Sequence, residues 1–204
     1  MKWTFLAVIW LFLSCGSARL VDSDKKHPEQ FKMQKVLVIG STSNRYARKK
    51  FEEQLAKKLR HEGIDAKESL EHFEDYFSIA EKSEKDLQKL EKEFRTQGFN
   101  SILLSRTTQE KDQLNLGQSL NIFQRIFGSH QDDDYNNKMI YKGEDKPKKV
   151  FRTETALYSL EDKKSKLIWT GKIDIINPQT IKDSVRKYVF LLMATLRSEG
   201  FIAD

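Results

Sequence analysis

The 204-residue sequence contains few of the residues that crosslink or interrupt a chain: one cysteine, three prolines and nine glycines. A single cysteine cannot form an intramolecular disulfide, so no disulfide framework is expected. The sequence also has only one long apolar run, Trp3–Leu13. This run is shorter than the roughly 20 residues that span a bilayer, and no other segment approaches that length. The pattern excludes a polytopic membrane protein and a disulfide-rich secreted scaffold.

The apolar run follows Lys2 and has the length and the flanks of a signal peptide, which we place at residues 1–14. The sole cysteine, Cys15, comes directly after it. The stretch 12–16, Phe-Leu-Ser-Cys-Gly, resembles a relaxed bacterial lipobox, in which a small residue precedes a cysteine that is lipidated and becomes the mature N-terminus. Phe12 stands where the usual pattern has Leu. The resemblance implies lipidation of Cys15 and attachment to the outer membrane or another cell membrane.

An alternative cleavage site lies four residues further along. Gly16 and Ala18 are the small residues that an ordinary signal peptidase reads, and cleavage there would release a secreted chain that starts at Arg19. Residues 15–34 mix both charge signs with scattered apolar positions, which indicates a lipid anchor and a tether. Residues 35–204 are then expected to form a single domain.

The composition is globular, with 38% hydrophobic and 32% charged residues, and the net charge is +6. Because both signs are interspersed along the chain, most of this charge is interpreted as solvated surface. The excess of positive charge favours acidic partners such as anionic lipids or surface polymers. A nucleic-acid partner is not predicted for an exported chain.

Hydrophobic periodicity predicts an α/β fold with a mixed β-sheet: β-α-β-α-β, then a β-hairpin and a C-terminal helix, with the helices packed on the sheet. Gly63, Gly98 and Gly200 each follow a predicted helix and precede an apolar residue, as glycines do where they end a helix. The predicted strands are 35–40, 64–69, 99–105, 150–160 and 167–176, and the predicted helices are 44–62, 81–97 and a last one after Pro178.

A long loop is expected at residues 106–149, with a short helix at 118–126. Loops of this length are usually functional or disordered, and the sequence leaves both open. His130 with Asp132–Asp134 could ligate a hard cation, but the run lacks the spacing and the turn glycine of a calcium loop, so a solvated acidic loop is favoured. The other histidines form no pair at ligand spacing. No metal and no cofactor are predicted.

The first strand and the hairpin together resemble a loose group of envelope lipoproteins of didermic bacteria. Its members are similar to the amino-terminal domain of the Tol-Pal propeller protein and to the curli-secretion lipoprotein. The matching stretches are Lys35–Gly40 with its charged helix, Thr155–Leu160 with its Leu-Tyr pair, and Leu167–Gly171 with its Trp. The resemblance implies an envelope-facing binding or assembly module, and it transfers no catalytic residue.

The loop after the first strand is the sharpest candidate for a site. Ser41 and Asn44 can cap the following helix, whose first turns carry Arg45 and Arg48. Cations at a helix N-terminus oppose the helix dipole, and a bound anion would relieve that conflict. We therefore predict an anion site at these four residues, set against the alternative of a solvated basic face capped by Asn44.

This loop faintly resembles the hydroxyl-rich phosphate loop of flavodoxins, although Ser43 stands where they have glycine. A flavodoxin-like module for a small anion or nucleotide is therefore the alternative function. No dinucleotide fingerprint, P-loop or nucleophile elbow is present, so no enzyme is predicted. The sequence favours a non-catalytic, lipid-anchored cell-envelope protein that binds another envelope protein or a surface polymer.

Overall fold

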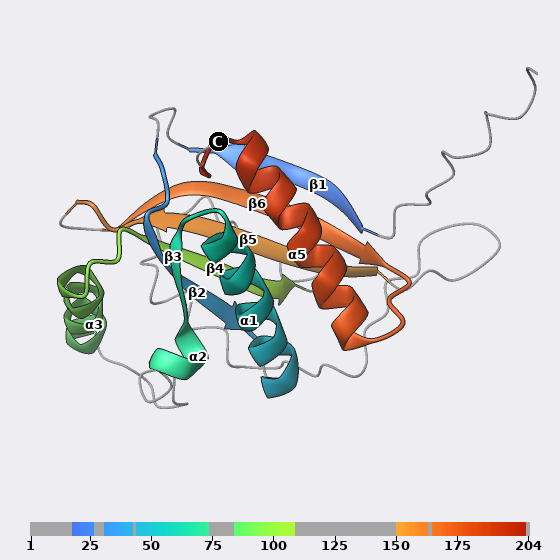
Figure 1. Ribbon diagram of the computed structural model, residues 1–204, viewed down its shortest axis with the longest axis horizontal. Helices are drawn as coiled ribbons and strands as arrows, with labels where there is room; N and C mark the ends of the chain where they lie inside the picture. Colours follow the sequence, from blue (N-terminus) through green and yellow to red (C-terminus); the bar gives the residue numbers. More distant parts are fainter. Residues whose placement is uncertain are drawn as a thin grey trace, which may run out of the picture.

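A six-stranded mixed sheet with the order β1-β6-β5-β4-β2-β3 lies at the centre of the protein in a computed structural model (Figure 1). The structure describes residues 18–26, 31–42, 44–73, 84–108, 150–162 and 165–202. Strands β2, β3 and β4 are parallel, and β5, β6 and β1 continue the sheet in antiparallel fashion. The strands are β1 Ala18–Lys25, β2 Lys35–Ser41, β3 Asp65–Glu68, β4 Ser101–Thr108, β5 Val150–Ser159 and β6 Lys166–Ile176. The described helices are α1 Arg45–His61, α2 Ser69–His72, α3 Glu84–Thr96 and α5 Ile181–Ser198.

Each face of the sheet carries its own apolar core. On one face α1 and α5 lie side by side across the strands (Figure 1), and they bury Leu55, Leu192 and Trp169 with the alternate residues of β2. On the other face, Phe94 of α3 packs edge-on against Phe73, with ring centroids 4.9 Å apart. None of the helices in the described part of the chain has both the length and the apolar composition of a membrane span.

The structure confirms the predicted α/β class and the mixed sheet with helices packed on it. All three glycine stops are confirmed: Gly63, Gly98 and Gly200 have φ values of 81°, 82° and 79°. Each of these glycines donates its N–H to the residue three before it, and the apolar residue that follows donates to the residue five before it. This pair of bonds satisfies carbonyls that the helix end leaves open.

The tether predicted for residues 15–34 is wrong where the structure describes this segment. Ala18–Lys25 forms the edge strand β1 on β6, and Phe31 and Met33 are buried in the core. The strand escaped the sequence pattern because it exposes side chains on both faces, so that backbone pairing holds it rather than an apolar face. The predicted loop also begins later than expected, because β4 continues to Thr108.

Candidate functional site

A cavity of about 240 Å³ opens between the starts of α1 and α5. It lies where β2 and β4 end, which is the edge of an open α/β sheet at which ligands usually bind. We call this edge the pocket end of the sheet. The lining residues are Gly40, Ser41, Thr42, Ala47, Arg48, Phe51, Ser105, Arg106, Thr107, Phe151, Thr153, Ile175, Pro178, Gln179, Thr180, Ile181, Ser184, Val185 and Tyr188.

Most of the cavity wall is apolar. Phe51 of α1 and Tyr188 of α5 meet with ring centroids 5.6 Å apart, and Phe151 and Ile175 add side chains from β5 and β6. Tyr188 is buried. These walls can hold an apolar group of a ligand, because they remove it from water.

A buried cationic cluster lies next to the cavity but on the opposite face of the sheet. Side chains of β4 alternate between the two faces, so Arg106 shares the face of Leu104, whereas Ser105 lies on the α5 face. The Arg106 side chain is only 13% exposed, and its Nη2 lies 3.7 Å from Oε2 of the buried Glu154. Within the described residues, Nε and Nη2 of Arg106 make no hydrogen bond. A buried guanidinium donor without a partner is costly, so an anion placed here would gain both charge and hydrogen bonds. Lys172 lies 3.9 Å from the other oxygen of Glu154, which leaves this trio with one excess positive charge.

Three hydroxyl groups meet on the cavity side of the sheet, next to α5. The Ser105 and Thr155 oxygens are 3.0 Å apart, and the Tyr188 hydroxyl donates to Ser105 at 3.0 Å while it also bonds Thr155. Burial raises the pKa of Tyr188 to about 12, against the lowering effect of the two hydroxyl partners. The phenol is therefore neutral at physiological pH and can act as a hydrogen-bond donor, not as a base.

The four residues of the predicted anion site divide into two pairs. Ser41 and Arg48 line the cavity. Asn44 instead caps α1, because its Oδ1 accepts the Ala47 N–H at 2.9 Å, and Arg45 is exposed outside the cavity lining. Asn44 thus caps α1, as the alternative interpretation expected, and the anion site itself stays a prediction.

Arg48 is held in place by a buried carboxylate. Its Nε donates to Glu52 at 2.9 Å and its Nη2 to Ser69 at 3.0 Å. Glu52 is 1% exposed and also accepts the Gly40 N–H, the Ser69 hydroxyl and the Leu70 N–H. Its negative charge compensates Arg48, which is the arginine on the cavity's face of the sheet.

Sequence reasoning missed Arg106 as a site residue because it placed residue 106 at the start of the loop. Pairing of β2 with β4 sets Ser41 opposite Arg106, and pairing of β4 with β5 sets Arg106 opposite Glu154. A longer β4 could have been suspected, because Ser-Arg-Thr-Thr at 105–108 is compatible with an alternating strand. The packing of α5 against the ends of β4 and β5 leaves no pattern in the local sequence.

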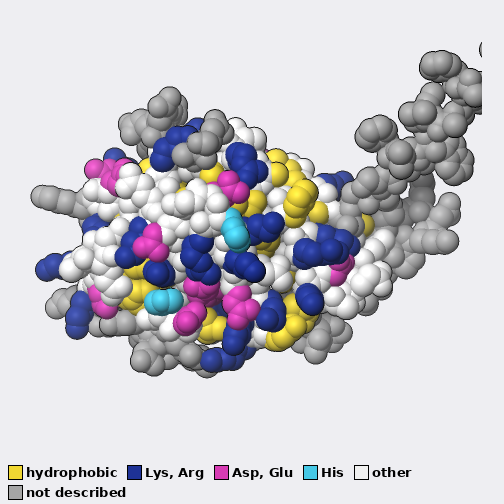
Figure 2. All heavy atoms as spheres, in the orientation of Figure 1, with side chains coloured by type: hydrophobic (Ala, Val, Ile, Leu, Met, Phe, Trp, Pro, Cys, Tyr) yellow, Lys and Arg dark blue, Asp and Glu magenta, His cyan; other side chains and the backbone are white. Residues whose placement is uncertain are grey.

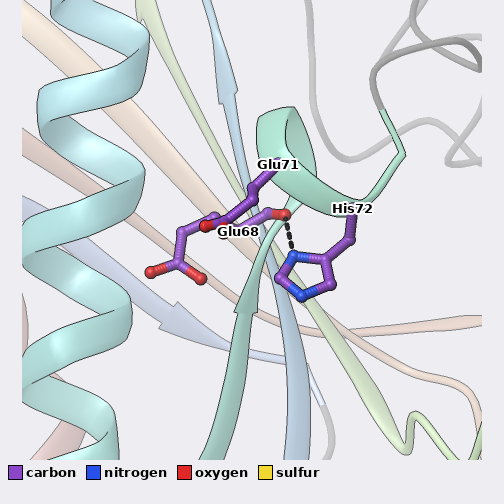
Figure 3. A group of neighbouring side chains, drawn as sticks. All are labelled: Glu68, Glu71 and His72. Carbon is purple, nitrogen blue, oxygen red and sulfur yellow. Dashed lines mark hydrogen bonds between the residues drawn. The ribbon is translucent and has the colours of Figure 1, made fainter.

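A second cluster, Glu68, Glu71 and His72, brings its ligand-type atoms within 4.8 Å of one another (Figure 3). Arg60 occupies both oxygens of Glu68 at 3.0 and 3.2 Å, and Figure 3 shows that carboxylate turned toward α1 and away from the His72 ring. His72 uses Nδ1 on the Glu68 carbonyl oxygen at 3.1 Å. The cluster is explained by these contacts and not by a cation.

Other predicted features lie outside the described residues. They are the lipidation residue Cys15, the short helix at 118–126, and His130 with its neighbouring aspartates. The flavodoxin-like alternative meets a topological obstacle, since a flavodoxin sheet continues with parallel strands. Here β5, β6 and β1 are antiparallel. The parallel part is confined to β3-β2-β4.

No family model matches the chain, and no curated protein matches it. Among solved structures, it is similar to the PelC dodecamer from Paraburkholderia phytofirmans, with 12% identity, a TM-score of 0.45, and coverage of 92% of this chain and 99% of that chain. The lipoprotein GNA1162 from Neisseria meningitidis matches at 12% identity and a TM-score of 0.42, covering 81% of this chain and 96% of that one. The hypothetical protein CT253 from Chlamydia trachomatis matches at 10% identity and 0.42, covering 84% and 98%. Identities and scores this low assign neither a function nor a location.

Proposed function

We propose that this chain is a non-catalytic, lipid-anchored protein of the cell envelope, and that its α1–α5 pocket binds a small anion with an apolar group. The observation that carries the ligand proposal is the cavity itself, a mostly apolar space of about 240 Å³ whose lining includes Arg48 and the bonded hydroxyls of Ser105 and Tyr188. The envelope part rests on the signal peptide and the lipobox-like stretch that ends at Cys15.

The size of the cavity limits the ligand. Its volume of about 240 Å³ is below the roughly 300–1,000 Å³ of pockets that hold drug-sized molecules. A phosphate or carboxylate on a short alkyl or aryl group fits this volume. The anionic group would lie between Arg48 and the Ser105 and Tyr188 hydroxyls, and the apolar group against Phe51 and Phe151.

Binding without catalysis is the function that the side chains support. The Ser105 hydroxyl bonds the hydroxyls of Thr155 and Tyr188. To act as a nucleophile, a serine needs a hydrogen-bonded base where these two hydroxyls lie. Tyr188 stays protonated. We therefore propose that the chain is the ligand-binding part of an assembly. Its macromolecular partner would be an envelope protein or a surface polymer.

Calorimetric titration with n-hexyl phosphate tests the pocket. We expect saturable binding of hexyl phosphate, and weaker binding of both hexanol and inorganic phosphate, because each of those lacks one half of the ligand. Arg48→Gln should weaken binding by about ten- to a hundredfold, as removal of a charged hydrogen-bond donor does. Arg60→Gln is the matched control, since Arg60 is also ion-paired but lies outside the cavity lining.

Two outcomes would overturn the pocket proposal: no binding of hexyl phosphate to the unsubstituted protein, or equal binding to Arg48→Gln. The anchor has a separate test, the mass of the N-terminal peptide from the membrane fraction of the native host. A diacylglyceryl group on Cys15 is expected. A peptide that starts at Arg19 in the soluble fraction would show a secreted protein instead.

A further inference from the structure

The pocket end gathers several chain segments that are distant in sequence. Strand pairing sets Ala18, the first residue of β1, beside Ile175 near the end of β6. Val150, the first residue of β5, pairs with Ile176. Helices α1 and α5 both start at this edge, directly after β2 and β6 (Figure 1). The start of β1 and the pocket therefore share one end of the domain.

Covalent geometry then limits where this end can lie. Only Gly16 and Ser17 separate Cys15 from Ala18. Three Cα–Cα steps span at most about 11 Å. A lipid on Cys15, which is part of the proposed function on which this inference rests, would hold the first residue of β1 within that distance of the anchor. The long tether expected from the sequence would have left the orientation open, whereas β1 removes that freedom.

The side chains at this end suit an anionic lipid surface. The exposed cations here are Arg19, Arg45, Lys49, Lys182 and Arg186. Figure 2 shows Lys and Arg side chains gathered over the first half of α5. The first turn of α1 contains no acidic residue, so the positive end of its dipole adds to the same field.

The carboxylates at this end are already engaged by cations. Asp174 is buried between Arg19 and Arg152, and Asp183 pairs with Arg186 and Lys187. They reduce the local positive charge but offer no exposed acidic patch that would repel lipid phosphates.

Exposed apolar side chains accompany these cations. Among the described residues, four large hydrophobic side chains are strongly exposed, and three of them, Leu20, Val21 and Tyr46, lie in the first half of β1 or the first turn of α1. Tyr46 is 53% exposed. Tyrosine is enriched at the headgroup level of membranes, because its ring is apolar and its hydroxyl is polar.

We propose that the pocket end of the domain lies flat on an anionic membrane surface, with Arg45, Lys49 and Lys182 on lipid phosphates and Tyr46 among the headgroups. The pocket then faces the lipid headgroup region, and its ligand is drawn from molecules that carry the same phosphate chemistry. Charge complementarity and the short connection to Cys15 favour a lipid surface over a second copy of the chain.

Flotation of the full chain with Cys15→Ser tests the surface without the anchor. We expect binding to vesicles that contain phosphatidylglycerol, weaker binding to phosphatidylcholine alone, and loss of binding as salt is raised. The double variant Arg45→Glu, Lys49→Glu should weaken binding at least about tenfold. Lys57→Glu, Lys58→Glu is the matched control: it makes the same change of charge on the same helix, near its other end.

Orientation is then measured on lipidated protein in vesicles. Because Cys15 is the only cysteine, a dye can be attached to an introduced cysteine once lipidation has blocked that thiol. A dye at Lys182→Cys should be quenched by spin-labelled lipid, and a dye at Lys57→Cys should not.

Three results would overturn the inference: no preference for phosphatidylglycerol, equal losses in the two double variants, or equal quenching at both dye positions. Preference that vanishes on removal of residues 109–149, which connect Thr108 to Val150 at this same end, would assign the surface to that segment and would also overturn it. Failure of the anchor shows separately, as an unmodified Cys15 peptide. Failure of the pocket shows separately in the hexyl phosphate titration.

Discussion

The two ends of the β-sheet differ in how their polar groups are satisfied. At one end, which we call the glycine end, α1, α3 and α5 finish at Gly63, Gly98 and Gly200, and three equivalent pairs of backbone hydrogen bonds close the helices. Asn100 adds side-chain bonds to the backbone of residues 32, 34 and 35. At the pocket end, α1 and α5 begin around a cavity lined by apolar side chains, Arg48 and the bonded hydroxyls of Ser105 and Tyr188.

This difference separates structural roles from functional ones. At the glycine end, backbone hydrogen bonds satisfy the helix ends, so the residues of that end stabilise the fold. The pocket end is built from side chains of six elements, and it retains donors, positive charge and apolar surface for a ligand. Substitutions at the two ends should therefore separate stability from binding.

The largest effect is expected for Glu52→Ala, which breaks the support of the pocket end. It leaves the Gly40 and Leu70 N–H groups and the buried Arg48 without their acceptor. Removal of one partner of a buried ion pair costs about 3–5 kcal/mol, and urea denaturation measures this loss. Glu53→Ala is the control, since Glu53 is 41% exposed and its surface pairs with Lys49 and Lys50 contribute little. Equal losses in the two variants would contradict this description of Glu52.

A smaller loss of about 1–2 kcal/mol is expected for Gly200→Ala at the glycine end. An added Cβ meets no atom within 4 Å, so the cost is purely conformational at φ 79°. Gly200→Asn should lose less, because Asn tolerates this conformation better. Thermal or urea unfolding measures both variants. Hexyl phosphate binding should be unchanged in each, and a weakened titration would contradict the separation of the two ends.

Acidification should weaken the pocket end through Asp174. Burial would raise the pKa of Asp174, but hydrogen bonds from Arg152 and Arg19 outweigh it and lower the pKa below its usual value. A carboxylate whose pKa is lower in the folded state adds stability above its unfolded pKa of about 3.9, and this contribution is lost as the pH falls through the folded pKa. Urea unfolding between neutral pH and pH values below that range should show this loss, and Asp174→Asn should flatten it. An unchanged slope in the variant would assign the acid sensitivity to other groups.

The smallest change in stability is expected for Arg60→Gln, at about 1 kcal/mol or less. Arg60 is 43% exposed and bonds Glu68 and the Ala66 carbonyl, and partly exposed pairs contribute little. Unfolding in urea and the hexyl phosphate titration together measure the separation: Arg60→Gln should change stability slightly and binding not at all. A binding loss as large as that of Arg48→Gln would remove the distinction between the two arginines.

The sequence predicts the glycine end better than the pocket end, and the reason is physical. Glycine stops, the Asn44 cap and the apolar faces of α1 and α5 are consequences of local spacing, so they could be read from short segments. β1 could not, because an edge strand with exposed side chains depends on β6, which lies about 150 residues away in the chain. The surroundings of Arg106 and Tyr188 depend on long-range strand pairing and on helix packing, which no short segment of the sequence records.

Hydrogen–deuterium exchange of the full chain with and without hexyl phosphate tests the contrast between the two ends most directly. We predict slower exchange on binding at residues 41–48, 105–108, 151–153 and 178–188, which surround the pocket, and no change around Gly63, Gly98 and Gly200. Protection confined to the glycine turns, or no protection at a saturating concentration of hexyl phosphate, would contradict the account.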